Sequence, residues 1–126
     1  MILNKKKIKE KLKRFSTYKD GWNEKSSISP TEKPIKISEA IIRAYEIFFS
    51  EYKIKPAKVD VFPLNSGGIN ITFEISEENF MEIDLENNSK LSFLIENEHI
   101  RLSGLLKTTE GLFVLFDALH YQQKEE

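Results

Sequence analysis

The chain has 126 residues, of which 31% are charged and 40% hydrophobic, with 19 basic and 20 acidic side chains. This length suits a single domain with its own hydrophobic core, and the absence of cysteine excludes disulfides, thiolate zinc sites and a cysteine nucleophile. No apolar run is long enough to span a membrane, and lysines stand where a signal peptide needs an apolar core, so we expect a cytoplasmic protein without membrane contact.

The first predicted element is a basic amphipathic helix over residues 1–16. Its apolar positions fall on one side of a helical wheel: Met1, Ile8, Leu12 and Phe15. The other positions are crowded with cations: Lys5, Lys6, Lys7, Lys9, Lys11, Lys13 and Arg14. These cations could bind nucleic-acid phosphates, or they could form a solvated helix face that balances acidic residues elsewhere.

Residues 17–34 are predicted to form a loop, because they are rich in Ser, Thr, Gly and Pro. Asp20 and Gly21 are a turn signal within it. Trp22 is the single tryptophan of the chain. It either closes an edge of the core or stands exposed as an interface anchor, and we favour the core edge because aromatic residues beside a glycine turn commonly pack there.

A core helix is predicted over residues 35–53, and Pro56 ends this region. We expect its inward side to consist of apolar residues at helical spacing: Ile37, Ala40, Ile41, Ala44, Tyr45, Ile47, Phe48 and Tyr52. A closing helix is predicted over residues 108–123, with Thr108 or Thr109 as its N-cap.

Between these helices, residues 58–103 change to a period of two, which is typical of strands. Two turn segments with hairpin chemistry separate the runs, at 65–68 and 87–90. The sequence therefore predicts an α+β domain in the order α-α-β-β-β-β-(β)-α. Its antiparallel meander has four strands, or five if residues 100–103 form a strand, and the helices pack on one face.

The other face of this sheet is predicted to be acidic with apolar islands, because successive side chains of a strand point to opposite faces. Its candidate binding residues are Glu74, Phe80, Glu82, Asp84, Glu86, Leu94 and Glu96. Carboxylates at this density repel one another, so they do not serve stability. They either dock a basic partner, such as the nucleic-acid groove of a nuclease or repressor, or they keep the sheet soluble and guard it against aggregation.

The sequence offers no residue constellation typical of catalysis or of cofactor binding. Its two histidines, His99 and His120, are not at metal-ligand spacing, and on a strand His99 would point away from Glu96. We expect His120 to be hydrogen-bonded at the margin of the core. Gly67 and Gly68 lack the following helix and lysine of a phosphate-binding loop. We therefore expect no enzymatic activity, no catalytic residues, no metal and no cofactor.

The segment Tyr18-Lys19-Asp20-Gly21-Trp22-Asn23 resembles a Tyr-x-Asp-Gly-Trp-Asp/Asn pattern in a group of small, mostly uncharacterised bacterial and mobile-element proteins. The resemblance extends over about residues 12–95, with a Pro-Ile start to a long helix and a meander. The matching residues are Phe15, Tyr18, Asp20, Gly21, Trp22, Asn23, Pro34, Ile35, Ala44, Pro63, Gly67, Gly68 and Ile69. Glu24 stands where a second glycine is often seen, and Phe73 where a tryptophan is common.

This resemblance implies a non-enzymatic accessory protein, such as an antitoxin-like or immunity-type factor. Together with the small size and the acidic face, it also fits phage-encoded inhibitors of host defence, including anti-CRISPR proteins. We expect an inhibitory binding protein of this kind, encoded by a phage or mobile element. It would bind a basic nucleic-acid-processing effector, such as a CRISPR nuclease, or its guide RNA. The alternatives are an antitoxin that neutralises a toxin and an RNA- or DNA-binding module that uses the basic helix.

Overall fold

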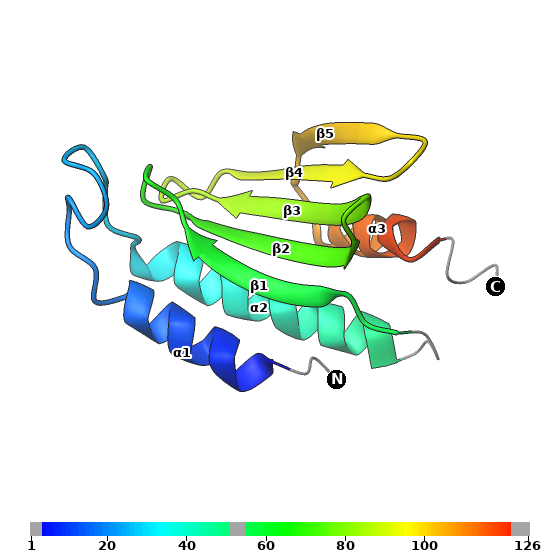
Figure 1. The fold of residues 1–126 in the computed structure, drawn as a ribbon, viewed down its shortest axis with the longest axis horizontal. Coiled ribbons are helices and arrows are strands. Elements are labelled where there is room, and N and C mark those ends of the chain that lie inside the picture. The colour runs from blue at the N-terminus through cyan, green and yellow to red at the C-terminus, as the bar shows by residue number, and fades with distance from the viewer. Residues whose placement is uncertain (1–3, 51–54, 122–126) are drawn as a thin grey trace.

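The computed structural model describes residues 4–50 and 55–121, which form three helices and one five-stranded antiparallel sheet (Figure 1). In chain order the elements are α1 (Lys5–Phe15), α2 (Glu32–Ser50), β1 (Lys58–Pro63), β2 (Ile69–Ser76), β3 (Asn79–Leu85), β4 (Leu91–Glu96), β5 (Arg101–Leu105) and α3 (Thr109–Leu119). The strands are adjacent in the same order, and the helices lie on one side of the sheet. The α+β prediction is therefore confirmed, and the fifth strand is present.

The element boundaries differ slightly from the predicted ones. α2 begins at Glu32 and not at residue 35, because Pro34 falls in its first turn, where a missing N–H breaks no helical hydrogen bond. Thr108 is the N-cap of α3, and its Oγ1 accepts a hydrogen bond of 2.9 Å from Gly111 N–H. The sheet extends to Leu105, two residues beyond the predicted end. The predicted helix ends at 53 and 123, with Met1 and Tyr52, lie outside the described residues.

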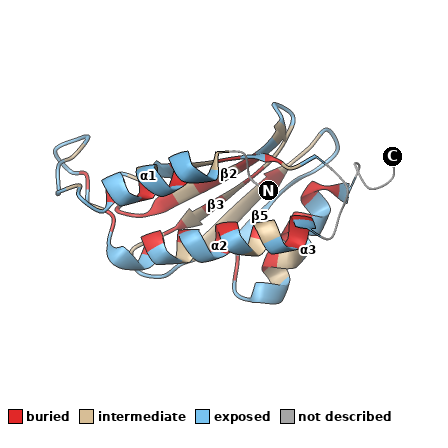
Figure 2. Ribbon diagram, turned by 90° about the horizontal axis from the view of Figure 1, so that it is seen from below, coloured by how far each residue is buried: buried red, intermediate tan, exposed pale blue. Residues whose placement is uncertain are grey.

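The core lies between the helices and the sheet, and buried residues mark the sheet-facing sides of the helices (Figure 2). In α2 the prediction was wrong for Ile47 and Ala40, which are exposed, whereas Ile42 and Phe49 are buried. The buried side of α2 is centred on Tyr45, which is 0% exposed. Ile47 follows two residues later, which places it about 200° around the helix axis, on the solvent side.

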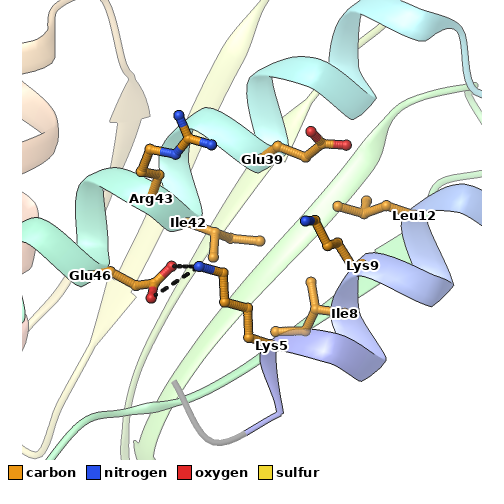
Figure 3. A pocket seen from close by; sticks show the side chains of 8 residues that line it. All are labelled: Lys5, Ile8, Lys9, Leu12, Glu39, Ile42, Arg43 and Glu46. Carbon is orange, nitrogen blue, oxygen red and sulfur yellow. Dashed lines mark hydrogen bonds and ion pairs between the residues drawn. The ribbon is translucent and has the colours of Figure 1, made fainter. Parts of the chain in front are cut away.

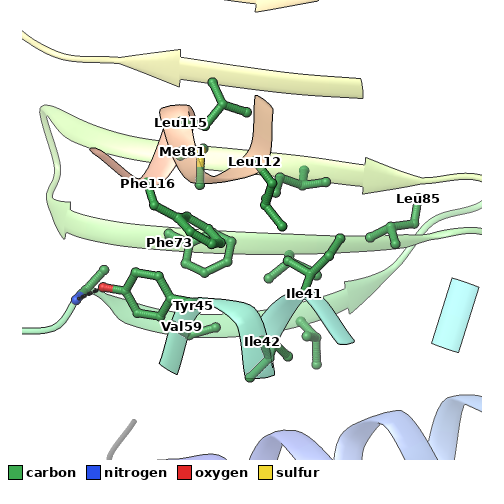
Figure 4. Close-up of a cluster of buried hydrophobic side chains, with 14 of the residues drawn as sticks. Ile41, Ile42, Tyr45, Val59, Phe73, Met81, Leu85, Leu112, Leu115 and Phe116 are labelled. Atoms are coloured by element: carbon green, nitrogen blue, oxygen red, sulfur yellow. Dashed lines mark hydrogen bonds between the residues drawn. The ribbon is translucent and has the colours of Figure 1, made fainter. Parts of the chain in front are cut away.

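Tyr45 forms the polar centre of this core (Figure 4). Its ring centroid lies 5.0 Å from that of Phe73 and 5.1 Å from that of Phe116. Ala57 N–H donates to Tyr45 Oη over 2.8 Å, and the same hydroxyl is hydrogen-bonded to His120 Nε2 over 2.7 Å. Burial raises the pKa of Tyr45 to about 12. His120 is therefore hydrogen-bonded as predicted, but it is completely buried and not at the core margin.

The two edges of the sheet differ in how they are covered. At the β1 edge, Asn4 Nδ2 donates to Val59 O over 2.8 Å. Lys11 of α1 reaches around the same edge, where Nζ lies 2.6 Å from Asp60 Oδ1 and 4.5 Å from the centroid of the Phe62 ring. At the other edge, all five residues of β5 are exposed. α1 thus covers one sheet edge, and the opposite edge stays open.

Candidate binding face

The side chains that point away from the helices form a surface that we call the open face. It consists of Lys58, Asp60, Phe62, Asn70, Thr72, Glu74, Phe80, Glu82, Asp84, Ser92, Leu94, Glu96, Arg101, Ser103 and Leu105. The alternate residues on the central strands, including Ile71, Phe73 and Ile83, are fully buried beneath it. Six of the seven predicted binding residues lie on this face within the strands, and the seventh, Glu86, comes directly after β3. The structure thus brings the predicted set together.

The strand register orders the open face into three cross-strand rows. The first is Lys58, Glu74, Phe80, Glu96 and Arg101. The second is Asp60, Thr72, Glu82, Leu94 and Ser103, and the third is Phe62, Asn70, Asp84, Ser92 and Leu105. No carboxylate therefore lies directly opposite another on these strands, because neutral residues separate them. The repulsion expected from the sequence is reduced, although the charge of Asp84 still acts on Glu82 along β3.

The charges on the open face are divided between the middle and the outer strands. β2, β3 and β4 contribute carboxylates and no lysine or arginine, whereas Lys58 and Arg101 lie on the outermost strands. Arg101 Nε is 3.7 Å from Glu96 Oε1, and this is the ion pair that links β4 to β5. Within the described part of the chain, no lysine or arginine forms an ion pair with Glu82 or Asp84. The middle of the face is acidic without local compensation.

Glu82 and Asp84 differ in their surroundings. Asp84 Oδ1 accepts a hydrogen bond of 2.8 Å from Asn70 Nδ2, and Asn70 Oδ1 accepts one of 2.8 Å from Thr72 Oγ1. Glu82 lies between Thr72 and Leu94 and is half-buried. Burial raises the pKa of Glu82, and the neighbouring charge of Asp84 raises it further. Glu82 is therefore the carboxylate for which a partner's cation would relieve the largest local cost.

Apolar side chains are interspersed with these carboxylates. Phe80 and Leu94 are half-buried in the middle of the face, while Phe62 is 45% and Leu105 is 52% exposed at its two sides. Sequence reasoning identified Phe80 and Leu94 but missed Asp60, Phe62 and Leu105. Asp60 and Phe62 were predictable, because they alternate with Val59 and Val61 along β1.

Most cations of α1 lie away from the open face, because α1 lies on the helix side of the sheet, next to α2. Lys11 is the exception, since it pairs with Asp60. Lys5 Nζ is 3.1 Å from Glu46 Oε1, and the two face each other across the groove between α1 and α2 (Figure 3). The same groove is lined by Lys9 and Arg43 together with Glu39. Among the described residues, the predicted cations that are exposed and form no ion pair are Lys6, Lys7, Lys9, Lys13 and Arg14. Acidic residues of α2 thus offset part of this charge.

The Asp-Gly-Trp-Asn segment holds its loop against the hairpins at the end of the sheet. Trp22 is half-buried, its ring stacks on Tyr18 at 5.2 Å, and its Nε1–H donates to Ile28 O over 2.9 Å. Asn23 Nδ2 donates to Asn65 Oδ1 in the β1–β2 turn over 3.0 Å. Trp22 is therefore fixed within its own loop by Tyr18 and Ile28. It is not among the partly buried side chains that pack against the core, so the favoured core-edge position stays a prediction.

Asn87, in the β3–β4 turn, anchors the same loop. Its Oδ1 accepts hydrogen bonds from Thr31 N–H (3.0 Å) and Thr31 Oγ1 (2.9 Å), and its Nδ2 donates to Ser29 O (3.2 Å). Gly67 has a φ of +100° and lies so close to Asn87 that a Cβ would overlap the amide. Of these residues, Gly67 belongs to the sequence resemblance, and the contacts of Asn87 fix the loop.

The remaining chemistry candidates lie apart from the open face. His99 is exposed in the β4–β5 turn, and His120 is in the core. Among the residues that the structure describes, no three His, Asp or Glu side chains are grouped so that they could hold a metal ion. No helix within the ranges 4–50 and 55–121 is both long and apolar enough to cross a membrane. No protein-family model, curated protein or solved structure matches the chain.

Proposed function

We propose that the protein is a non-enzymatic inhibitory binding protein of the anti-CRISPR-like kind, and that its open face binds the basic nucleic-acid site of an effector. The observation that carries this proposal is the acidic middle of the open face. There Glu74, Glu82, Asp84 and Glu96 surround Phe80 and Leu94, and the same three strands supply no cation. A partner site that normally binds phosphates offers the complementary arrangement of positive charge.

The two kinds of residue on this face would contribute differently to binding. The carboxylates would steer the basic partner and raise the association rate, an effect that falls with salt. Phe80 and Leu94 are already half-buried, so a partner that covers them removes the rest of their apolar surface from water. Glu82 is the electrostatic centre, because a cation beside it would offset the burial and repulsion that raise its pKa.

An antitoxin that neutralises a basic toxin would use the same chemistry, so it is the closest alternative to an effector inhibitor. A direct nucleic-acid-binding role would instead use α1. That role is supported by the exposed Lys6, Lys7 and Lys13, but Glu10 and Glu39 lie among the cations of this side. The open face combines charge and apolar surface, and α1 offers charge alone.

The test is affinity capture from the host followed by an inhibition assay on the captured protein. The variant Glu82→Gln, Asp84→Asn, Glu96→Gln removes three charges with little change of shape, and Lys6→Gln, Lys9→Gln, Lys13→Gln is the matched control on α1. We expect the control to retain the partner and the open-face variant to lose it. The captured protein should bind nucleic acid, and excess DNA or RNA should displace it. Equal capture by both variants would exclude the open face as the binding surface.

A mobility-shift assay with labelled RNA tests the second candidate function, direct nucleic-acid binding by α1. If α1 binds nucleic acid directly, affinity should fall steeply between low and physiological salt, and the triple lysine variant should abolish the shift. If α1 has no such role, no shift appears at low salt, while capture of the protein partner is unaffected.

A further inference from the structure

The backbone edge of β5 is a feature that the proposed function does not use, although Arg101, Ser103 and Leu105 also contribute side chains to the open face. β5 ends the sheet, hydrogen-bonds to β4 alone, and all of its five residues are exposed. Leu102 is 54% and Leu105 is 52% exposed, and Ile100, just before the strand, is 48% exposed. The strand contains no proline, and its one charge is Arg101. Natural proteins usually protect such an edge, because its unpaired backbone groups are a template for another strand.

The hydrogen bonds at the two ends of β5 show which backbone groups point outward. Leu106 N–H donates to Leu91 O over 2.9 Å, and Asn97 N–H donates to Ile100 O over 3.0 Å. Even-numbered residues therefore direct their backbone groups toward β4. Because these directions alternate in an antiparallel ladder, Arg101, Ser103 and Leu105 direct N–H and C=O away from the sheet.

A second copy of the same strand fits this edge in one register. When two β5 strands run antiparallel about Ser103, Arg101 of one copy pairs with Leu105 of the other, and Leu102 with Gly104. This register overlaps all five residues, and every outward N–H and C=O gains a partner. No like charges lie opposite each other, because Arg101 faces a leucine.

The side chains on the helix side of β5 also suit this register. Gly104 has no side chain, and the Phe93 ring lies against its backbone, with Cε1 3.3 Å from the position of a Cβ. Leu102 of the second copy would lie over this bare backbone and beside the ring. Leu102 of each copy would lose exposed apolar surface, which favours association.

We propose that β5 is a homodimerisation edge and that two copies join there into one continuous ten-stranded sheet. At the β1 edge, Asn4 already occupies Val59 O, Asp60 Oδ1 accepts from Val61 N–H, and Lys11 pairs with Asp60. Among the described strands this edge is therefore less available than β5, and we expect growth to stop at two copies. Two paired strands of five residues bury less area than a stable interface of standard size, so the dimer is of the weak class. Both open faces remain on one side of the joined sheet.

The register can be tested by cross-linking, because the chain has no cysteine. In the proposed dimer the two copies of residue 103 face each other with Cα atoms about 5.5 Å apart, which suits a disulfide. Ser103→Cys should therefore give a covalent dimer under mild oxidation. Leu105→Cys is the matched control, since its two thiols would be roughly 13 Å apart along the strands. Equal cross-linking of both variants, or of neither, would overturn the register.

Association without cross-linking is measured by sedimentation equilibrium from about 1 µM to about 1 mM, a range that covers weak dimers. Leu102→Lys should raise the dissociation constant at least about tenfold, because it places charge at the edge. Ile47→Lys, at a residue of α2 that is 57% exposed, makes the same change away from β5 and should have no effect. A wild-type protein that stays monomeric at every concentration would refute the proposal. Equal weakening by both substitutions would refute it as well. The open-face variant Glu82→Gln, Asp84→Asn, which leaves the Glu96–Arg101 pair in place, should dimerise normally, and this separates the test from that of the proposed function.

Discussion

The two faces of the sheet are built from the same strands, yet they differ in what each residue contributes. On the helix side, Val59, Ile71 and Phe73 are 0% exposed and belong to the core between the sheet and the helices. On the open face the side chains are exposed or half-buried, and the middle three strands carry carboxylates. The difference teaches that stability is concentrated on one face, so residues on the other are free to serve binding.

Polar groups follow the same division. In the core, Tyr45 accepts from Ala57 and pairs with His120, so the burial of these groups is compensated. On the open face, Glu82 is half-buried and forms no ion pair with a described lysine or arginine, and its pKa is raised. A buried polar group that is paired stabilises a fold, whereas an uncompensated one is a local cost.

The largest expected effect comes from truncating one ring on each face. Phe73→Ala should lower the free energy of unfolding by about 3–5 kcal/mol, because it leaves a cavity beneath Tyr45 and Phe116. Phe80→Ala should cost no more than about 1 kcal/mol, since that ring stays partly hydrated in the folded protein. Urea denaturation measures both. Similar losses for the two variants would show that the faces do not differ in stability as proposed.

The next effect concerns the polar centre of the core. Tyr45→Phe leaves the buried Ala57 N–H and His120 Nε2 without this partner, which should cost about 1–3 kcal/mol. Tyr18→Phe is the control. Tyr18 follows α1, its ring contacts the rings of Phe15 and Trp22, and the substitution keeps that ring. Thermal unfolding followed by circular dichroism measures the difference. If both variants melt like the wild type, the hydroxyl of Tyr45 does not stabilise the core.

The smallest effect is the pH dependence caused by Glu82. Because burial and Asp84 raise its pKa in the folded protein, the folded state binds the proton more tightly than the unfolded chain. The resulting stabilisation is fully present below the ordinary glutamate pKa and is lost as pH rises through the raised value. Glu82→Gln lacks this loss, so it should be more stable than the wild type at neutral pH. The gain should stay below about 1 kcal/mol, since the carboxylate remains partly hydrated.

Denaturation of both proteins from acidic to neutral pH tests this prediction. The stability difference should grow with rising pH and then level off. A difference that is constant over the whole range would mean that Glu82 does not titrate as the structure indicates. Asp60→Asn, at a carboxylate already paired with Lys11, serves as the comparison and should lower stability at neutral pH.

Much of the fold follows from local patterns. The period of two between residues 58 and 103 predicted the strands, and Thr108 predicted the start of α3, because strand alternation and helix capping are set by neighbouring residues. The same alternation placed Glu82 and Phe80 on the face away from the helices. The prediction that Ile47 of α2 faces the core was wrong, because the side of a helix that becomes buried depends on which elements pack against it.

The candidate site was predictable as a set of residues but not as an arrangement. Staggering of the carboxylates depends on the register between strands, which the turns and the packing of the sheet fix together. Lys11 pairs with Asp60, 49 positions away, and no local pattern reports such a contact.

By itself, the sequence determined an α+β domain without cysteine, a basic first helix and an acidic sheet face, because composition and periodicity act over a few residues. Only the tertiary structure decided that Asn4 and Lys11 contact the β1 edge while β5 stays open, and that His120 lies in the core against Tyr45. It also decided that no ion pair joins Glu82 to a lysine or arginine of the ranges 4–50 and 55–121. These outcomes depend on contacts between distant segments, whose geometry is fixed when the helices pack against the completed sheet.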